Sequence, residues 1–507
     1  MPYRRRPSRF ISVAGLLCLV LFGLPILATP SPLPRLPVEE FELPNGMRFL
    51  LVRRPGAPMV VAGWAVRTGS GDEQPGRTGI SHLLEHLMFH GSERIGTRNA
   101  EREGVLIARQ DEVRDRLDAL LTRPDSPERD SEITGLERRL EELRQEHGKL
   151  ILRGELQRIY QTAGAVGTNA LTDRDFTAYY GQLPAHKLEL WFWLESDRLL
   201  APVFRELDRE GQVVEEERRQ RLESTPLGPL TEKLTEVVWE GHSYAWPTLG
   251  RTQDLAALRR ADVEAWFAAH YRPDRITAVL VGDFDPEEVK ALARAYFGRL
   301  PRPASSPAVE PAKPATVQVA ERRSAQTCDC APQARVFYRT PPFGHPDTYA
   351  LDVLAGLLNG RTGRLHRSLV VDRQAAFAAF ALHHPQRQGG LFGVTLEAKG
   401  EVKPADLVAA WEGELEKIRT GPISDRELEK VKNQITTDAW RRLADPVELA
   451  LRLLSYDAQG GWEQINRWPE ATLAVTAEDV RRVAATYLQP KLRTVGIFER
   501  GGERRAR

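Results

Sequence analysis

The sequence carries one pattern of elements twice, and this repetition limits the folds open to the chain more than any other feature. In the first half, residues 66–68 (VRT) are followed by a Gly-rich loop and then by an apolar segment with helical spacing at residues 83–91. In the second half, residues 338–340 (YRT), a loop with Pro and Gly, and an apolar segment at residues 351–360 come in the same order. A pattern that recurs over this length predicts one structural plan used twice.

The ends of the two halves echo each other as well. Residues 261–273 begin with Ala-Asp-Val and end with Tyr and Pro, and residues 478–490 begin with Glu-Asp-Val and end in the same way. Between the halves, residues 301–316 hold five prolines and almost no large apolar side chain, which predicts a semi-stiff linker. We therefore predict two homologous α+β domains of roughly 200 residues each, at 36–300 and 317–498.

The N-terminus has the pattern of an export signal. Arg4, Arg5 and Arg6 form a basic start, and residues 10–28 follow without a charge. This apolar run is close to the ~20 residues that span a bilayer. Residues 1–28 are therefore predicted to be a signal peptide or an uncleaved N-terminal anchor. Either case predicts an exported protein, periplasmic or anchored at the membrane and facing the periplasm.

Composition narrows the classes of partner. Lys and Arg number 71 against 70 Asp and Glu, so no net basic charge is present to hold nucleic acid. Three cysteines cannot make a disulfide framework in a chain of this size. Cys328 and Cys330 lie two positions apart, which predicts at most a strained bridge between them.

Residues 103–160 differ from the rest of the first half. Two apolar stripes run through this charged stretch, one formed by Leu106, Val113, Leu117 and Leu120 and the other by Ile133, Leu136, Leu140, Leu143 and Leu150. A Pro-containing break at residues 124–127 separates them, which predicts an antiparallel helical hairpin inserted into the domain. Its charged faces are expected to be solvated, and docking of a partner is the alternative.

The segment at residues 79–89 carries the chemistry. His82 and His86 are four residues apart on a predicted helix, so both imidazoles project from one face and can bind one tetrahedral zinc ion. Glu85 shares that face and can take a proton from a water molecule on the metal. A catalytic zinc needs three protein ligands and one open position, so a third ligand must come from elsewhere.

Two observations bear on whether this pattern is functional. A short His-x-x-Glu-His pattern also arises by chance, but charged and imidazole groups fit poorly in an ordinary apolar core. His90 lies two turns from His82 and drifts off the shared face, so it is predicted to be a surface residue. In the second half, Leu351, Leu354 and Ala355 stand where His82, Glu85 and His86 stand in the first. Only the first half can therefore carry the chemistry.

The HxxEH order of residues 82–86, followed by Met88-Phe89 and Gly91, resembles the pitrilysin or insulinase family of zinc peptidases. Its shorter members include the mitochondrial processing peptidases and bacterial relatives. Residues 167–180 resemble the family's NAxT…DxTxYY stretch, residues 209–219 its distal acidic helix, and residues 271–283 the strand that closes its first domain. The resemblance implies two homologous α/β-sandwich domains, each a mixed sheet covered by helices, that form a clamshell.

The same resemblance implies the rest of the metal site. The family's third zinc ligand lies seven residues after the Glu of an Arg-Glu pair, which here gives Glu217, with Glu215 and Glu216 close enough to leave the assignment open. Glu210 is expected to orient a ligand by a hydrogen bond. One Zn²⁺ per chain, with Glu85 as general base, implies a zinc-dependent endopeptidase that acts on peptides or unfolded protein segments.

The family's substrate strand corresponds to Asn169, Ala170 and Thr172. The resemblance implies an edge strand to which an extended peptide adds through backbone hydrogen bonds. An ordinary strand is the alternative reading of these residues.

One segment departs from the family's pattern. Relatives carry an Arg and a Tyr in the second domain that reach the substrate, whereas Val370 and Phe377 stand in those places here and cannot donate a hydrogen bond. Either the protein works without these donors, or a homologous partner subunit supplies them in a heterodimer. A non-catalytic scaffold subunit and a zinc-binding chamber that captures peptides without cutting them are the rival functions.

Overall fold

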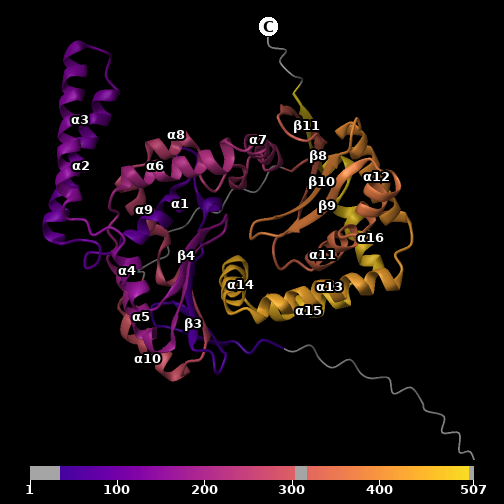
Figure 1. Ribbon diagram of the computed structural model, residues 1–507, viewed down its shortest axis with the longest axis horizontal. Helices are drawn as coiled ribbons and strands as arrows, with labels where there is room; N and C mark the ends of the chain where they lie inside the picture. The colour runs from indigo at the N-terminus through magenta and orange to yellow at the C-terminus, as the bar shows by residue number, and fades with distance from the viewer. Residues whose placement is uncertain (1–34, 303–316, 502–507) are drawn as a thin grey trace, which may run out of the picture. The chain divides into compact units, whose positions relative to one another are not determined.

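A computed structural model describes residues 35–302 and 317–501, which are arranged around two mixed β-sheets (Figure 1). The predicted export segment at residues 1–28 lies outside the described residues, as do residues 303–316 of the predicted linker. Within the described ranges, no helix combines the length and apolar character needed to cross a bilayer.

The first sheet belongs to the first half and has the strand order β1-β2-β6-β3-β5-β4. Strands β2 and β6 pair in parallel, and the other neighbours pair antiparallel. The strands are β1 (Glu39–Glu42), β2 (Arg48–Arg53), β3 (Met59–Val66), β4 (Val166–Thr172), β5 (Thr177–Pro184) and β6 (Ile276–Gly282). The strand with the predicted substrate residues, β4, is thus an edge strand.

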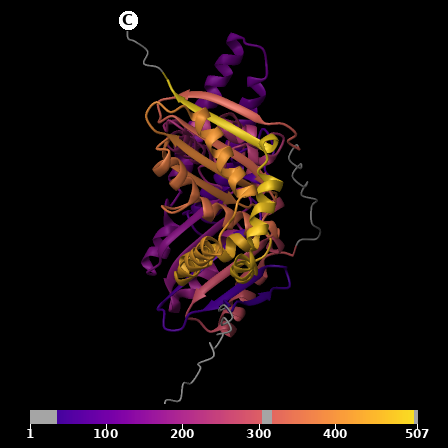
Figure 2. The same cartoon turned by 90° about the vertical axis from the view of Figure 1, so that its right-hand side faces the viewer.

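The second sheet repeats this plan with the order β7-β11-β8-β10-β9. Here β7 and β11 pair in parallel, and the remaining neighbours pair antiparallel. Strands β8 to β11 are labelled in Figure 1, and Figure 2 shows the same cartoon turned by 90°. The strands are β7 (Arg322–Cys328), β8 (Gln333–Thr340), β9 (Ala376–His384), β10 (Gly390–Ala398) and β11 (Arg493–Arg500). Position by position, β7 corresponds to β2, β8 to β3, β9 to β4, β10 to β5 and β11 to β6, which confirms that one plan is used twice.

Helices cover both sheets, which confirms the predicted α+β fold class with its two mixed sheets. Those of the first half are α1 (Ile80–Leu87), α2 (Ala100–Leu121), α3 (Pro127–Gly148), α4 (Glu155–Thr162), α5 (Leu188–Leu200), α6 (Leu207–Arg218), α7 (Gly228–Val238), α8 (Thr252–Ala257), α9 (Arg260–His270) and α10 (Pro286–Tyr296). Those of the second half are α11 (Asp347–Leu358), α12 (Pro404–Thr420), α13 (Asp425–Ala444), α14 (Pro446–Gln459), α15 (Gln464–Ala474) and α16 (Ala477–Tyr487).

The two faces of the first sheet are covered by helices from different halves. Alternate residues of β2, such as Phe49 and Leu51, join a core with α1, α5, α9 and α10 on one face. Their neighbours Leu50 and Val52 face the other way and pack against Leu449 and Leu453 of α14, a helix of the second half. Burial on both faces explains why the central strand β6 reads as a continuous apolar run.

A helix of the first half likewise packs against the second sheet. Helix α7 of the first half contacts β7, β8 and β11, and the adjoining Val238 and Trp239 pack with Phe337 and Leu391 of the second sheet. Polar contacts close to α1 join the halves too, because the guanidinium of Arg387 bonds both carboxylate oxygens of Asp72 at 2.8 and 2.9 Å. Each half therefore includes a helix of the other in its packing, which the sequence pattern alone did not predict.

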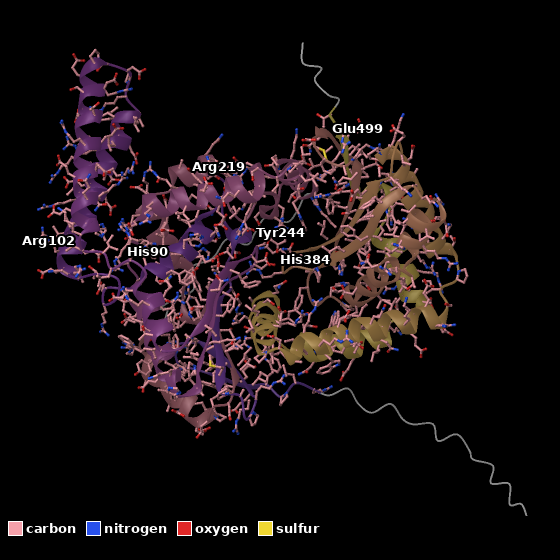
Figure 3. The ribbon with its side chains drawn as sticks, in the orientation of Figure 1. His90, Arg102, Arg219, Tyr244, His384 and Glu499 are labelled. Carbon is pink, nitrogen blue, oxygen red and sulfur yellow. A yellow bond between two sulfur atoms is a disulfide. The ribbon has the colours of Figure 1, made fainter. Side chains whose placement is uncertain are left out.

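Two smaller features complete the fold. In the inserted stretch, α2 and α3 lie side by side, and an Asn99 and a Ser126 side chain cap their N-termini (Figure 1). Cys328 and Cys330 are joined by a disulfide, and the sulfur of Cys328 lies 3.7 Å from the carbonyl oxygen of Glu499 (Figure 3).

Candidate metal centre

Helix α1 begins in a backbone conformation that only glycine adopts without strain. Gly79 caps it with φ of 90°, and a Cβ there would come within 2.9 Å of the Cα of Gly250. The buried carboxylate of Glu73 accepts hydrogen bonds from the backbone N–H groups of Gly79, at 2.8 Å, and Ser81, at 2.9 Å. These contacts fix where the helix starts, and thus which of its residues face α6.

Three predicted ligands meet between α1 and α6. The Nε2 atoms of His82 and His86 lie 3.7 and 3.4 Å from the same carboxylate oxygen of Glu217, Oε2. One donor atom from each of these residues lies within 4.8 Å of the others. Of the neighbouring carboxylates, Glu216 points elsewhere and bonds the side chains of Arg219 and Gln220. The geometry therefore selects Glu217 over Glu216 as the third member of this cluster.

The cluster fits a zinc ion. Ligands placed ~2.0–2.1 Å from a tetrahedral centre lie about 3.3–3.4 Å apart, close to the observed spacing, and two imidazole nitrogens with one carboxylate oxygen are a typical catalytic donor set. His82 is 6% exposed, and this burial, with the nearby charge on His86, lowers its pKa to about 3. His82 is therefore neutral near pH 7, the form in which an imidazole binds a metal.

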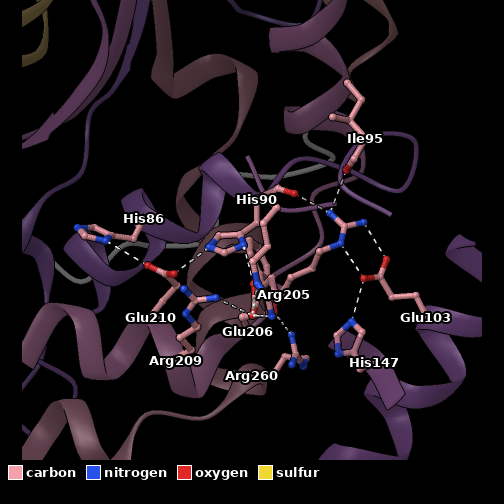
Figure 4. A network of polar contacts seen from close by, with 12 residues as sticks. His86, His90, Ile95, Glu103, His147, Arg205, Glu206, Arg209, Glu210 and Arg260 are labelled. Carbon is pink, nitrogen blue, oxygen red and sulfur yellow. Dashed lines mark hydrogen bonds and ion pairs between the residues drawn. The ribbon is translucent and has the colours of Figure 1, made fainter. Parts of the chain in front are cut away.

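Glu210 orients His86 from the opposite side. Its Oε2 lies 3.3 Å from Nδ1 of His86, so the Nε2 atom of that ring is left facing Glu217 (Figure 4). Burial alone would lower the pKa of His86, but the hydrogen bond to Glu210 and the surrounding carboxylates raise it. Burial likewise opposes ionisation of Glu210, yet bonds from His86 and His90 bring its pKa down to about 2.

The prediction that His90 is a surface residue is wrong. After α1 the chain continues into a short 3₁₀ turn, Met88–His90. There His90 Nε2 lies 3.1 Å from Glu210 Oε1, and the side chain is only 17% exposed (Figure 4). His90 follows His86 by four residues, so the two side chains lie about 40° apart around a helix, and both reach Glu210. His90 therefore supports the same carboxylate that orients His86.

Glu85 lies beside the cluster and is almost fully buried, at 7% exposure. Burial raises its pKa above the ordinary value, partly opposed by a hydrogen bond from Thr172. In that bond the Thr172 hydroxyl donates to Glu85 Oε2 at 2.5 Å. A carboxylate held close to the metal ligands can act as a general base.

The predicted substrate residues lie along β4. Asn169 is exposed, Ala170 and Thr172 are half-buried, and they pair with Tyr180, Tyr179 and Thr177 of β5. Because no described strand pairs with the other side of β4, its backbone there can accept an added strand. The Thr172 hydroxyl, however, points to Glu85 and so differs in role from the other two side chains.

Known proteins are similar to this chain along most of its length. The family model described as "Insulinase (Peptidase family M16)" matches residues 48–105, and "Peptidase M16 inactive domain" matches residues 257–435. The zinc protease PqqE of Helicobacter pylori is 26% identical over 461 residues, which cover 89% of this chain and 90% of that protein. The mitochondrial-processing peptidase subunit beta of Blastocladiella emersonii is 22% identical over 90% of this chain and 88% of its own length.

Solved structures share the fold. The crystal structure of a protease from Helicobacter pylori matches with a TM-score of 0.75 and 22% identity, over 91% of this chain and 99% of that one. The first half of the periplasmic protease PqqL from Escherichia coli matches with a TM-score of 0.69 and 16% identity, over 92% of both chains. The chain belongs to the pitrilysin/insulinase family.

In this pitrilysin/insulinase chain, the structure places the two second-half positions at which relatives carry an Arg and a Tyr. Val370 lies in a π-helical turn, His366–Asp372, and packs against the second core. Phe377 lies on the edge strand β9 with 70% of its surface exposed. Neither side chain carries a polar group that could reach a substrate.

Sequence reasoning missed one residue that holds the site and gave another a different role. Glu73 lies in the Gly-rich loop seven residues before α1 begins, where no capping signal points to it. Thr172 was assigned to substrate binding because it follows Asn169 and Ala170 on one strand. No spacing in the sequence indicates its bond to Glu85, because 87 positions separate the two residues.

Proposed function

We propose that this protein is a zinc-dependent endopeptidase that cuts peptides or unfolded protein segments. The observation that carries the proposal is the convergence of His82, His86 and Glu217, with Glu85 beside them, in the first half. Among the described residues, no other group of His, Cys, Asp or Glu has the proximity needed to hold a metal ion.

Each part of the chain has a role in this proposal. His82, His86 and Glu217 would hold Zn²⁺, which lowers the pKa of water and polarises a carbonyl when it is bound. Glu85 takes a proton from the attacking water and returns it to the leaving amine. The open side of β4 holds the peptide by backbone hydrogen bonds, with little dependence on its side chains.

The test compares the wild-type protein with Glu85→Gln on a quenched fluorescent peptide, with zinc content measured on the same samples. Glu216→Gln serves as the matched control, because Glu216 is a solvent-facing carboxylate on the neighbouring helix. We expect Glu85→Gln to keep its zinc and to lose cleavage by about 10²–10⁴-fold, the usual contribution of a general base. Wild-type protein with neither zinc nor activity, alone or with a partner, would favour a non-catalytic scaffold subunit instead.

We propose further that the active form pairs with a homologous chain that lacks HxxEH. The support is that Val370 and Phe377 replace hydrogen-bond donors that relatives use, which leaves a place for a partner's Arg and Tyr. Coexpression with a homologous neighbour is expected to yield a co-purifying complex that cuts faster than this chain alone. A fully active monomer would contradict the pairing but not the peptidase.

Export is proposed on the basis of residues 1–28 alone. Fractionation of cells that produce the full chain, followed by N-terminal sequencing, separates a cleaved signal peptide from an anchor. Recovery of the intact chain in the cytoplasm would reject both forms of the proposal.

A further inference from the structure

The last residue of strand β4 contacts the candidate metal centre through its side chain. Thr172 is the last residue of β4 and pairs with Thr177, the first residue of β5. Its hydroxyl donates to Glu85 Oε2 at 2.5 Å, a short hydrogen bond of the kind that a hydroxyl makes to a carboxylate. The general base on α1 is thus tied directly to the strand proposed to hold the substrate.

The sheet gives this hydroxyl a defined position. Pairing with Thr177 fixes the backbone of Thr172, and a β-branched side chain has few rotamers open to it. Glu85 is nearly buried, whereas a free Glu side chain would sample several rotamers. A single bond from a stiff donor therefore limits the orientation of the whole carboxylate.

We propose that Thr172 is the positioning residue for Glu85, an inference that rests on the proposed peptidase function. With Oε2 occupied by the hydroxyl, Oε1 is the oxygen left to take the proton from the attacking water. The threonine keeps its own proton throughout, so it orients the base and takes no part in the transfer. Its role is exerted through Glu85 and requires no contact with the peptide.

This role differs in its consequences from direct substrate binding. A peptide that adds to β4 bonds backbone groups, and the hydroxyl of Thr172 is already engaged by Glu85. Loss of the hydroxyl should therefore slow the chemical step and leave peptide binding intact. A substrate-binding hydroxyl would instead change KM.

The experiment measures kcat and KM of Thr172→Val and Thr172→Ser against wild-type protein and Glu85→Gln. Valine keeps the branched shape and removes the hydroxyl, and serine restores it. We expect Thr172→Val to lower kcat by about 10–100-fold, as for loss of a hydrogen bond to a charged group. KM and zinc content should stay at wild-type values, and Thr172→Ser should regain most of the activity.

Thr134→Val is the control, because it makes the same substitution on α3, outside the proposed site. It should leave kcat unchanged. Thermal unfolding and zinc content of each variant separate a misfolded protein from a slow one, and the serine variant covers the case in which valine disrupts the fold.

Several outcomes overturn the inference. Wild-type kcat in Thr172→Val, with Glu85→Gln inactive, would reject the positioning role and leave the peptidase intact. A raised KM at constant kcat would assign Thr172 to substrate binding. An equal loss in Thr172→Val and Thr172→Ser would show that the hydroxyl is not what matters. Wild-type protein that cuts no peptide would reject the proposed function and this inference together.

Discussion

Helix α1 in the first half and helix α11 in the second occupy the same place in the same topology, yet they bury opposite kinds of side chain. On α1 the inward positions hold His82, Glu85 and His86, and α6 faces them with Glu210 and Glu217. The equivalent positions of α11 hold Leu351, Leu354 and Ala355. Beside α11 the helix α13 presents Val431 and Ile435, both close to Gly356.

The difference shows what the fold needs and what the site adds. Apolar side chains occupy these positions in the second half, so the polar set on α1 is not required by the architecture. Buried imidazoles and carboxylates cost free energy unless they are bonded. On α1 these bonds come from Thr172 and Glu210, while Glu73 holds the start of the helix.

The strongest test of this comparison replaces the three polar residues of α1 by the residues that stand at the equivalent positions of α11. A variant with His82→Leu, Glu85→Leu and His86→Ala should bind no zinc at the site and cut no peptide. Because Thr172, Glu210 and Glu217 would lose their partners on α1, the variant's free energy of unfolding without metal should be lower than that of the wild type. Zinc analysis and denaturant unfolding of metal-free samples measure both effects. Retained zinc binding would mean that the metal is held elsewhere.

The reverse exchange should damage the second half. Leu354→Glu places a carboxylate at the equivalent of Glu85, among the apolar side chains of the second core. We expect a loss of about 3–5 kcal/mol in the free energy of unfolding, the cost of an uncompensated buried charge. Denaturant unfolding measures this loss of stability. Leu354→Met, which conserves volume, is the control and should lower the free energy of unfolding by less than about 1.5 kcal/mol. Equal stability of the two variants would mean that the two cores differ less than their sequences suggest.

An ion-pair network found only in the first half should make stability depend on pH. Burial alone would raise the pKa of Glu103, but hydrogen bonds from His147 and Arg205 lower it to about 2 (Figure 4). Since the pKa is about 4.3 in the unfolded chain, this carboxylate stabilises the fold above pH ~4.3, and the effect is lost as pH falls towards 2. It contributes about 3 kcal/mol at neutral pH.

The measurement compares urea unfolding of wild type and Glu103→Gln at several pH values. The wild type should have the higher free energy of unfolding at pH 7, and the difference between the two proteins should become smaller below about pH 4. A gap that stays constant with pH would show that the ionised form of Glu103 is not what stabilises the insert.

The smallest expected effect is a change in zinc affinity when Glu210 is substituted. Glu210→Gln keeps the shape of the side chain but removes the charge that orients His86, and loss of such a partner weakens metal binding by about 10–100-fold. Competition with a chelator measures the zinc affinity. Glu216→Gln, on the same helix but bonded to Arg219 and Gln220, should bind zinc like the wild type. Equal weakening in both variants would argue for a general effect of charge on α6.

The sequence predicted those parts of the molecule that depend on local pattern. Apolar spacing predicted α1, and the two apolar stripes within residues 103–160 predicted the pair of helices α2 and α3. The cluster of His82, His86 and Glu217 followed from spacing and resemblance together, and the structure brings the three close to one another.

The remaining parts depend on contacts between distant segments. His90 is half-buried because it shares Glu210 with His86, and 120 positions separate His90 from Glu210 in the sequence. The exchange of α7 and α14 between the sheets arises because each sheet has a second apolar face, and nothing local states which helix covers it. The bond from Thr172 to Glu85 likewise exists only once β4 lies beside α1.

The most direct test of the central claim is anomalous diffraction at the zinc absorption edge from crystals of the zinc-loaded protein. The account predicts one strong peak per chain between His82, His86 and Glu217, and none beside Leu351 and Leu354 of α11. A map with no peak between α1 and α6, or with its main peak elsewhere in the chain, would contradict a zinc centre confined to the first half.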